Sequence, residues 1–311
     1  VSPVDGDQPS LLIGLIEWAR LLGLPVIAAG KSSESDFVWT PATNEVKAWG
    51  QTVVSKEVGQ NFIPNDHHSW GDVLANRASV PFDLTTVPDL CEMGIVANHT
   101  GLLPDCASLH APMARTVELP SIFRPKEEGG ILSGKGRVDM FNCLRRPDEL
   151  SFAGGVFVVI EAPDLETGKL FAAKGIPTCP NGKYVLIHNP VHLLGAEAAM
   201  SILSAVKLGT SCGGRDVRPV VDLIAIAQRQ IEVGELFEIG TRHVISGLGH
   251  QLIGAKPMSP DNPLPYYLCA GAKVVRPIPK GKIVSCGDVE IDSNSILYQL
   301  RQSQDQHFFP H

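Results

Sequence analysis

The segment that most constrains the fold runs from residue 8 to residue 31, where an amphipathic helix leads into a buried strand. In QPSLLIGLIEWARLLG the apolar residues repeat at helical spacing, with Asp7 or Gln8 as the N-cap and Gly23 as the stop. The run PVIAAGK that follows is short and almost wholly apolar, which is typical of a parallel strand buried on both faces. A helix followed by such a strand is half of a βαβ unit. We therefore expect this segment to belong to an α/β sheet.

The rest of the chain divides, by its predicted secondary structure, into a mixed region and a β-rich region. The mixed region predicts strands and helices in EVKAWGQTVVS, DHHSWGDVLANR, VPDLCEMGIVANHTG, GGVFVVIEA, KYVLIHN and HLLGAEAAMSILSAVKLG. The two strands GGVFVVIEA and KYVLIHN are expected to pair as antiparallel neighbours, and the last segment is expected to be a helix over 192–207. From about Arg218 onwards short β-rich pieces are punctuated by Gly and Pro, with no long helical period. We therefore expect three units with the boundaries 1–40, 41–215 and 216–311.

Composition excludes several classes of protein. The chain has 311 residues, 44% of them hydrophobic, and a net charge of −7 with no block of Lys or Arg, which disfavours nucleic acid as a partner. No apolar stretch reaches the roughly 18 residues of a membrane span. The seven cysteines are scattered without a CxxC pair, as expected of free thiols in a reducing compartment. These features predict a cytoplasmic protein that works without a membrane.

Lys31 and Glu92 are the two residues whose surroundings point to chemistry. Lys31 follows a buried strand, and ligands of open α/β sheets bind at the carboxyl ends of strands. A lysine there can protonate a carbonyl oxygen or hold a phosphate, although a solvated loop lysine is the alternative. Glu92 lies in the apolar run LCEMGIVAN, where a carboxylate needs a partner. We expect Glu92 to be largely buried and paired with a cation such as Lys31 or Arg124.

The histidines and the standard motifs give weaker signals. His188 and His192 are four residues apart, but the predicted break from strand to helix between them removes the geometry of a helical metal pair. His192 is expected to be a structural cap, the neighbouring residues His67 and His68 a solvated loop feature, and His110 stands alone in SLHAP. The sequence contains no GxGxxG after a strand and no GxxxxGK[ST], GxSxG or HExxH.

Five stretches together resemble one family. VDGDQP, VIAAGKSSESDFVW, CEMGIVANHTGL, LHAPMARTVELP and HNPVHLLGAEAAMSI are similar to the homoserine-dehydrogenase-like oxidoreductases that carry a C-terminal SAF domain, within them the 1-deoxy-D-xylulose 5-phosphate reductoisomerase-like group. The tail with its KGKIVSCGDV turn resembles a SAF (β-clip) domain. The resemblance implies an α/β plus α+β fold: a terminal βα unit of a Rossmann domain, a central α+β catalytic domain and an all-β SAF domain. It also implies that the first Rossmann units precede Val1, so this chain alone is expected to bind NADP poorly.

The resemblance and the positions discussed above give three sets of candidate site residues. The catalytic set is Lys31, Glu92 and His110. The substrate-binding set is Asn98, Thr100, Arg115, Arg124, Lys135, His188 and His192, in which the arginines suit an anionic group. The cofactor-binding set is Asp5, Gly6, Gly30 and Lys31.

The activity implied is that of an NADPH-dependent oxidoreductase of isoprenoid precursor synthesis, converting 1-deoxy-D-xylulose 5-phosphate to 2-C-methyl-D-erythritol 4-phosphate. The hydride comes from the cofactor, and the isomerase step would call for Mg²⁺ or Mn²⁺. A homodimer or higher oligomer is implied as well. Two alternatives stay open: a homoserine-dehydrogenase-like reductase of another substrate, and a non-catalytic ligand-binding protein. Coding sequence with GxGxxG upstream of Val1 would separate the enzyme from the binding protein.

Overall fold

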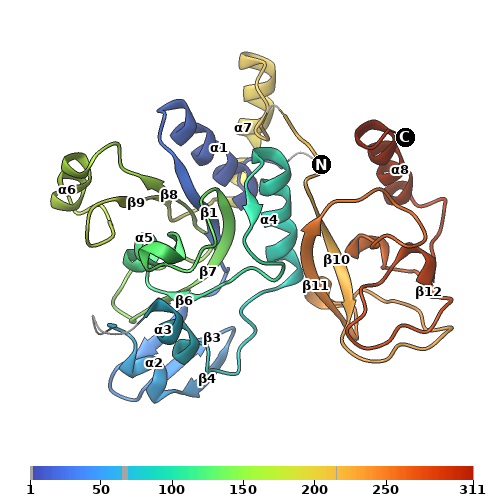
Figure 1. Ribbon diagram of the computed structural model, residues 1–311, viewed down its shortest axis with the longest axis horizontal. Coiled ribbons are helices and arrows are strands. Elements are labelled where there is room, and N and C mark those ends of the chain that lie inside the picture. The colour runs from blue at the N-terminus through green and yellow to red at the C-terminus, as the bar shows by residue number, and fades with distance from the viewer. Residues whose placement is uncertain (1–2, 65–68, 215, 311) are drawn as a thin grey trace.

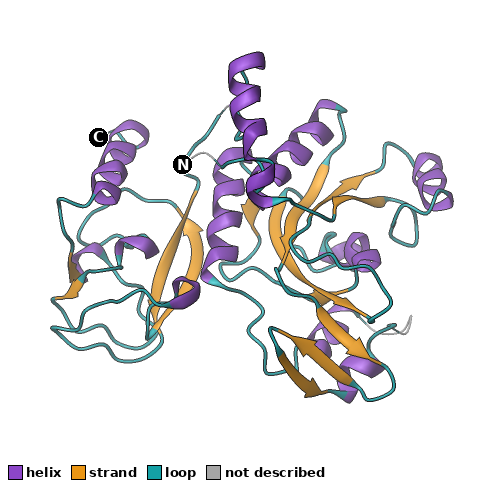
Figure 2. Ribbon diagram, turned by 180° about the vertical axis from the view of Figure 1, so that it is seen from behind, coloured by secondary structure: helices purple, strands orange, loops and turns teal. Residues whose placement is uncertain are grey.

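The computed structural model describes residues 3–64, 69–214 and 216–310. It places one large mixed sheet and its helices beside a C-terminal region of short strands (Figure 1). The helix α4 (Val87–Thr100) lies between these two parts (Figures 1 and 2). His67 and His68 lie outside the described residues. Within the described ranges, no helix has the length and apolar character needed to cross a bilayer.

The first helix and strand form as the sequence predicts. α1 (Gln8–Leu21) begins at Asp7, whose carboxylate accepts a hydrogen bond from the Gln8 backbone N–H at 2.9 Å. β1 (Val26–Ser32) is buried from Ile27 onwards. Behind the strand, the Gln8 side-chain amide donates to the carbonyls of Ser32 and Gly155. α1 is thereby fixed to the end of the strand that carries Lys31.

β1 is central in the sheet, and its surroundings correct one expectation. It pairs parallel with β7 and antiparallel with β8, so it is not a strand of an all-parallel sheet. The reason is the short connection 146–155 between β7 and β8, because a parallel crossover needs a dozen or more residues. The strand order is β4 (Gln51–Val54), β3 (Glu45–Ala48), β2 (Phe37–Thr40), β7 (Arg137–Arg145), β1, β8 (Val156–Glu161) and β9 (Tyr184–Asn189).

Two further short strands, β5 (Leu103–Pro104) and β6 (Met113–Ala114), also pair with β7. The expected antiparallel pairing of the strands now seen as β8 and β9 is confirmed. α1 and α4 pack on one face of the sheet, and α5 (Leu119–Ile122) packs on the other. At Gly30 an added Cβ would lie 2.1 Å from the Asp139 carbonyl oxygen, so the approach of β1 to β7 requires glycine.

The mixed region contains one further long helix, α4, and several short ones. α4 begins at Thr86 and ends at Gly101, which adopts the left-handed conformation expected of its position. The other helices are α2 (Lys56–Gln60), α3 (Trp70–Arg77), α6 (Leu165–Ala173) and α7 (Ala198–Leu203). The helix expected over 192–207 is interrupted: a 3₁₀ turn precedes α7, and a π turn over Ser204–Leu208 follows it. This segment projects from the body of the molecule (Figure 1).

Within residues 216–310, the C-terminal region contains two pairs of strands, three short 3₁₀ helices and one α-helix. β10 (Val221–Ala227) pairs antiparallel with β11 (Leu248–Gly254), and β12 (Lys273–Val274) with β13 (Val289–Glu290). The helix α8 (Ile296–Phe308) contradicts the expectation of an all-β unit. Its sequence is polar and exposes several of its apolar side chains, so hydrophobic periodicity did not reveal it. Arg301 fixes α8 instead, through an ion pair with Asp222 of β10 at 2.6 Å, and a second pair with Asp305 at 2.8 Å lies within α8 itself.

Candidate active site

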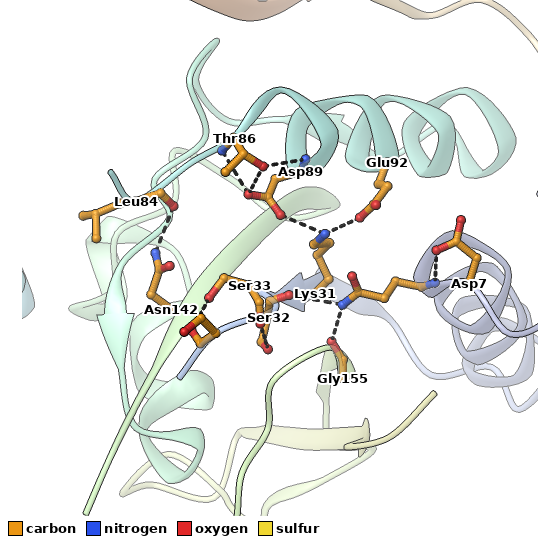
Figure 3. Close-up of polar contacts among 12 residues, drawn as sticks. Asp7, Lys31, Ser32, Ser33, Leu84, Thr86, Asp89, Glu92, Asn142 and Gly155 are labelled. Atoms are coloured by element: carbon orange, nitrogen blue, oxygen red, sulfur yellow. Dashed lines mark hydrogen bonds and ion pairs between the residues drawn. The ribbon is translucent and has the colours of Figure 1, made fainter. Parts of the chain in front are cut away.

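A buried lysine between two carboxylates forms the centre of the candidate site (Figure 3). Lys31 comes from the end of β1, and its Nζ atom lies 2.8 Å from Asp89 Oδ1 and also donates to Glu92 Oε2. The lysine side chain is 1% exposed, that of Asp89 6%, and that of Glu92 18%. The expected pairing of Glu92 with Lys31 is confirmed. Glu92 is the member of the cluster that solvent, and hence a ligand, reaches most readily.

The start of α4 holds Asp89 in place. The Thr86 backbone N–H and hydroxyl both donate to Asp89 Oδ2, at 2.9 and 2.7 Å, and the Asp89 N–H donates back to the Thr86 hydroxyl oxygen at 3.3 Å (Figure 3). This reciprocal arrangement is a capping box. One carboxylate oxygen therefore caps the helix while the other faces Lys31. Asp89 is a fixed anion, whereas Glu92 has no such anchor in the cluster.

The charges of the cluster shift its pKa values in a defined way. Burial acts to lower the pKa of Lys31, but the charges of Glu92 and Asp89 outweigh burial and raise that pKa above its usual value. Burial raises the pKa of the Glu92 carboxyl, against the opposing effect of Lys31. The ammonium group is thus held charged, and burial favours the protonated form of Glu92. The cluster combines a fixed positive charge with a carboxyl group whose pKa is raised.

A second polar cluster surrounds His110. Its Nδ1 lies 2.6 Å from Asp139 Oδ2, its Nε2 lies 3.5 Å from Asp105 Oδ2, and both carboxylates are nearly inaccessible. The backbone N–H groups of His110 and Ala111 also donate to Asp139 Oδ1. Burial acts to lower the pKa of His110, but Asp139 and then Asp105 raise it overall. The residues on either side, Leu109 and Ala111, have φ values of 59° and 44°, a strained backbone that these hydrogen bonds maintain.

Asn98 and Thr100 are engaged in holding the fold. The Asn98 side-chain oxygen accepts from the N–H groups of Val220 and Val221, at 2.8 and 2.9 Å, and its amide donates to the Val221 carbonyl. The Thr100 hydroxyl donates to the Val96 carbonyl within α4 at 2.7 Å. Asn98 therefore ties α4 to β10, and Thr100 closes the end of the helix. The structure does not bring either side chain into the polar contacts of the Lys31 cluster.

The remaining substrate-binding candidates are dispersed over the fold. Arg115 pairs with Glu149 at 2.9 Å and Lys135 with Glu161 at 2.5 Å, so each cation already has a carboxylate. The Arg124 side chain packs beside Gly129 and Gly130, and His188 lies exposed beside the Phe152 ring. The His192 ring packs against Gly154. These five residues do not converge on one site in this structure.

Comparison with known proteins gives the family of the chain. The family model described as "Oxidoreductase DRL, catalytic domain" matches residues 6–198. The chain belongs to the DRL oxidoreductase family. The matched segment contains Lys31, Asp89, Glu92 and the His110 cluster. No curated protein in the comparison matches the chain.

The cofactor-binding candidates Asp5, Gly6 and Gly30 already make structural contacts within the chain. Asp5 exchanges hydrogen bonds with the Ser201 side chain at 2.8 and 2.9 Å. Gly6 allows close packing, because an added Cβ would lie 1.8 Å from the Leu194 carbonyl oxygen, and Gly30 serves the β1–β7 contact. These three residues therefore offer no cradle for a dinucleotide. Of the four, only Lys31 faces a polar cluster.

A divalent metal does not fit the residues present. In the three described ranges, no group of three or more His, Cys, Asp or Glu side chains is placed to hold a metal ion. The two carboxylates nearest each other at the site, Asp89 and Glu92, already share the ammonium group of Lys31. We therefore derive no step through a metal.

Two carboxylates of the DRL catalytic domain, Asp89 and Asp139, were not predicted from the sequence as site residues. Asp89 stands in the pattern Thr86-x-x-Asp89, which signals a helix cap and nothing more. Asp139 lies in the strand RVDMFNCLR, where an acidic residue at an otherwise apolar position was the available signal. Its partner His110 comes from a loop, so only the tertiary structure brings the two together.

Proposed function

We propose that this protein is an NADP-dependent oxidoreductase of the 1-deoxy-D-xylulose 5-phosphate reductoisomerase type, acting on a small phosphorylated or hydroxylated carbonyl compound. The observation that supports this proposal is the lysine held charged between Asp89 and Glu92 at the end of a central strand. Membership of an oxidoreductase family gives the reaction class. On this proposal the dinucleotide is held by residues other than Asp5, Gly6 and Gly30.

Lys31 and Glu92 have different roles toward the substrate on this proposal. A charged ammonium group in a water-poor site stabilises the negative charge that develops on a carbonyl oxygen, and here it is preorganised by two carboxylates. Because the pKa of Lys31 is raised, it acts as a fixed hydrogen-bond donor more than as a proton source. Glu92, whose pKa burial raises, supplies or removes the proton at the substrate hydroxyl. Asp89 positions Lys31 and does not touch the substrate.

The test is turnover with 1-deoxy-D-xylulose 5-phosphate, followed as loss of NADPH absorbance by the full-length protein. We expect Glu92→Gln to lower kcat by about tenfold or more, because general acid–base catalysis contributes factors of this size or larger. The matched control is Glu161→Gln, a partly exposed carboxylate paired with Lys135. The control should retain kcat within about twofold, since a partly exposed ion pair contributes little. Equal kcat values for Glu92→Gln and the unaltered protein would remove Glu92 from the mechanism.

One observation favours a second candidate, a ligand-binding protein without turnover. Lys31 is 1% exposed, and its two partners already satisfy much of its charge. A cluster of this kind can also be purely structural. The same assay separates the two candidates, because a binding protein would give no NADPH loss with any carbonyl substrate while still being stabilised against heat by its ligand.

A further inference from the structure

A cavity of about 570 Å³ lies where the mixed sheet meets the C-terminal region, on the side of α4 where the helix begins. Its walls come from the β3–β4 hairpin, the segment 81–87 and the pair β10–β11. A cavity of this size is in the range of small-molecule sites. Its polar and charged lining residues are Gln51, Asp83, Thr85, Thr86, Gln228, Arg242 and His250. None of these was a candidate in the sequence, and three of them lie beyond the residues that the family model matches.

Arg242 gives the cavity a positive charge that is available for a ligand. Its guanidinium carbon lies over the Trp49 ring, 4.6 Å from the ring centre. Among the ion pairs of the described residues, none involves Arg242, whereas the nearby Arg229 pairs with Glu235 at 2.6 Å. Stacking on an aromatic ring fixes the plane of a guanidinium group and leaves its N–H edge free for an anion. Arg242 is therefore oriented without being neutralised.

The backbone around the cavity is strained where it presents these groups. Trp49, Arg242 and His243 have φ values of 52°, 52° and 61°, in the left-handed region that side chains other than glycine seldom adopt. Two tyrosines maintain the Arg242–His243 turn. The Tyr266 hydroxyl donates to the His243 carbonyl at 3.2 Å, and the Tyr267 hydroxyl lies 2.8 Å from His243 Nδ1. Strain that the surrounding structure maintains in this way is characteristic of ligand-holding positions.

The rest of the lining is suited to a polar ligand. Gln51, Gln228 and Thr85 offer amide and hydroxyl groups. Burial lowers the pKa of His250, so its imidazole is neutral at pH 7 and adds a hydrogen-bonding group without a charge. The lining also contains one carboxylate, Asp83, which is exposed like Arg242, so water screens both charges. The lining therefore combines a cation without an ion-pair partner among the described residues, an exposed carboxylate and several neutral hydrogen-bonding groups.

We propose that this cavity binds a small organic anion, a phosphate or carboxylate compound, through Arg242. The same cavity reaches the Lys31 cluster through Thr86. Thr86 lines the cavity, and its N–H and hydroxyl hold Asp89, which in turn holds Lys31. The proposed anion site and the Lys31 cluster are thus connected through the hydrogen bonds of Thr86.

Trp49 supplies a direct readout of binding. The unaltered protein is titrated with glycerol 3-phosphate, inorganic phosphate and succinate, with glycerol as the uncharged control, and tryptophan fluorescence is recorded at constant ionic strength. We expect a saturable change with at least one anion and none with glycerol. Trp49→Phe should abolish the signal, which identifies the ring concerned. The three anions distinguish an organic phosphate from a free phosphate ion and from a carboxylate.

The decisive comparison is between two arginines. Arg242→Gln should raise the half-saturation concentration by about tenfold or more, because it removes a charged hydrogen bond. Arg229→Gln, which alters an arginine of the same region outside the cavity, should leave it unchanged. No saturable change with any anion, or equal binding by Arg242→Gln and the unaltered protein, would overturn the proposal. Binding is measured without turnover, so a failed activity assay would leave this result standing, and a failed titration would leave the proposed function untouched.

Discussion

At the scale of single residues, the molecule concentrates charge where water is scarce. Lys31 is 1% exposed and is shared by two carboxylates, one anchored to a helix cap and one partly open to solvent. Removing one partner of a buried ion pair leaves the other charge uncompensated, which costs more than the pair contributes. The stability of the protein should therefore depend on the balance of this cluster as strongly as its activity does.

We expect Lys31→Met to lower the free energy of unfolding by about 3–5 kcal/mol, because Asp89 and Glu92 then remain as unpaired buried carboxylates. Lys31→Met combined with Glu92→Gln should lose less than Lys31→Met alone, since one of the stranded charges is gone. Urea denaturation of Lys31→Met, Glu92→Gln, the double variant and the unaltered protein gives the free energies of unfolding that this comparison needs. If the double variant is as unstable as the sum of its single changes, the charges are not coupled.

His110 should make stability depend on pH. Burial and Lys126 act to lower its folded pKa, but Asp139 and Asp105 raise it overall. The stabilising effect of the charged imidazole is therefore complete below the unfolded pKa of about 6.5 and is lost as pH rises through the folded pKa. The difference in unfolding free energy between the unaltered protein and His110→Gln should therefore be largest below about pH 6.5 and shrink above it. A difference that stays constant from acid to alkaline pH would contradict the imidazolium assignment.

At the scale of elements, small helices are held by buried polar anchors more than by apolar faces. Arg77 at the end of α3 is completely buried and binds both Glu118 oxygens at 2.7 and 2.8 Å. Its other hydrogen bonds go to the carbonyls of Asn61, Phe62 and Met113. One guanidinium group thus joins α3 to the end of α2 and to β6.

Arg77→Met should destabilise the protein by about 3–5 kcal/mol, because it strands Glu118 in the interior. Lys169→Met, which removes an exposed lysine paired with Glu166 on α6, serves as the control and should change stability by less than about 1 kcal/mol. Chemical denaturation of both variants gives the comparison. Similar losses for the two would mean that burial does not set the strength of the Arg77 pair.

Helices and strands could be predicted where local periodicity and burial agree, as in α1, β1 and α4. The antiparallel neighbour of β1 and the polar helix α8 could not, because strand pairing and the Arg301 anchor depend on residues far away in the chain. At the site, the Lys31–Glu92 pair followed from one rule, that a carboxylate in an apolar run must find a cation. Asp139 beside His110 and the cavity around Arg242 depend on tertiary placement, which no local pattern carries.

At the scale of the whole molecule, the segment around α7 leaves many apolar side chains exposed. Eight large apolar side chains there are between 48% and 75% exposed: Val191, Leu193, Leu194, Met200, Ile202, Leu203, Val206 and Leu208. A monomer seldom leaves so large an apolar patch open. This supports the proposal that the protein forms homodimers, with α7 packed on its counterpart.

The combined variant Ile202→Lys/Val206→Lys should shift the protein from dimer to monomer in light scattering coupled to size-exclusion chromatography. Charges placed in the middle of an apolar interface lose their hydration there, which opposes association. Leu170→Lys, on the exposed face of α6, is the control and should leave the molar mass unchanged. A monomeric unaltered protein, or a double variant that remains dimeric, would exclude α7 as the interface.

The position of β1 in the sheet also means that the strand is synthesised well before the strands that pair with it. β1 leaves the ribosome before the strands on its two sides, which begin at Arg137 and Val156. β1 ends at Ser32 and its first neighbour begins at Arg137, so at about 5–20 residues per second roughly 5–21 s of translation separate the two strands. For that interval the nascent chain carries an apolar strand, with Lys31 at its end, that has nothing to pair with. Cellular yield should therefore depend on chaperones that shield extended apolar segments during synthesis, even if the completed chain is stable.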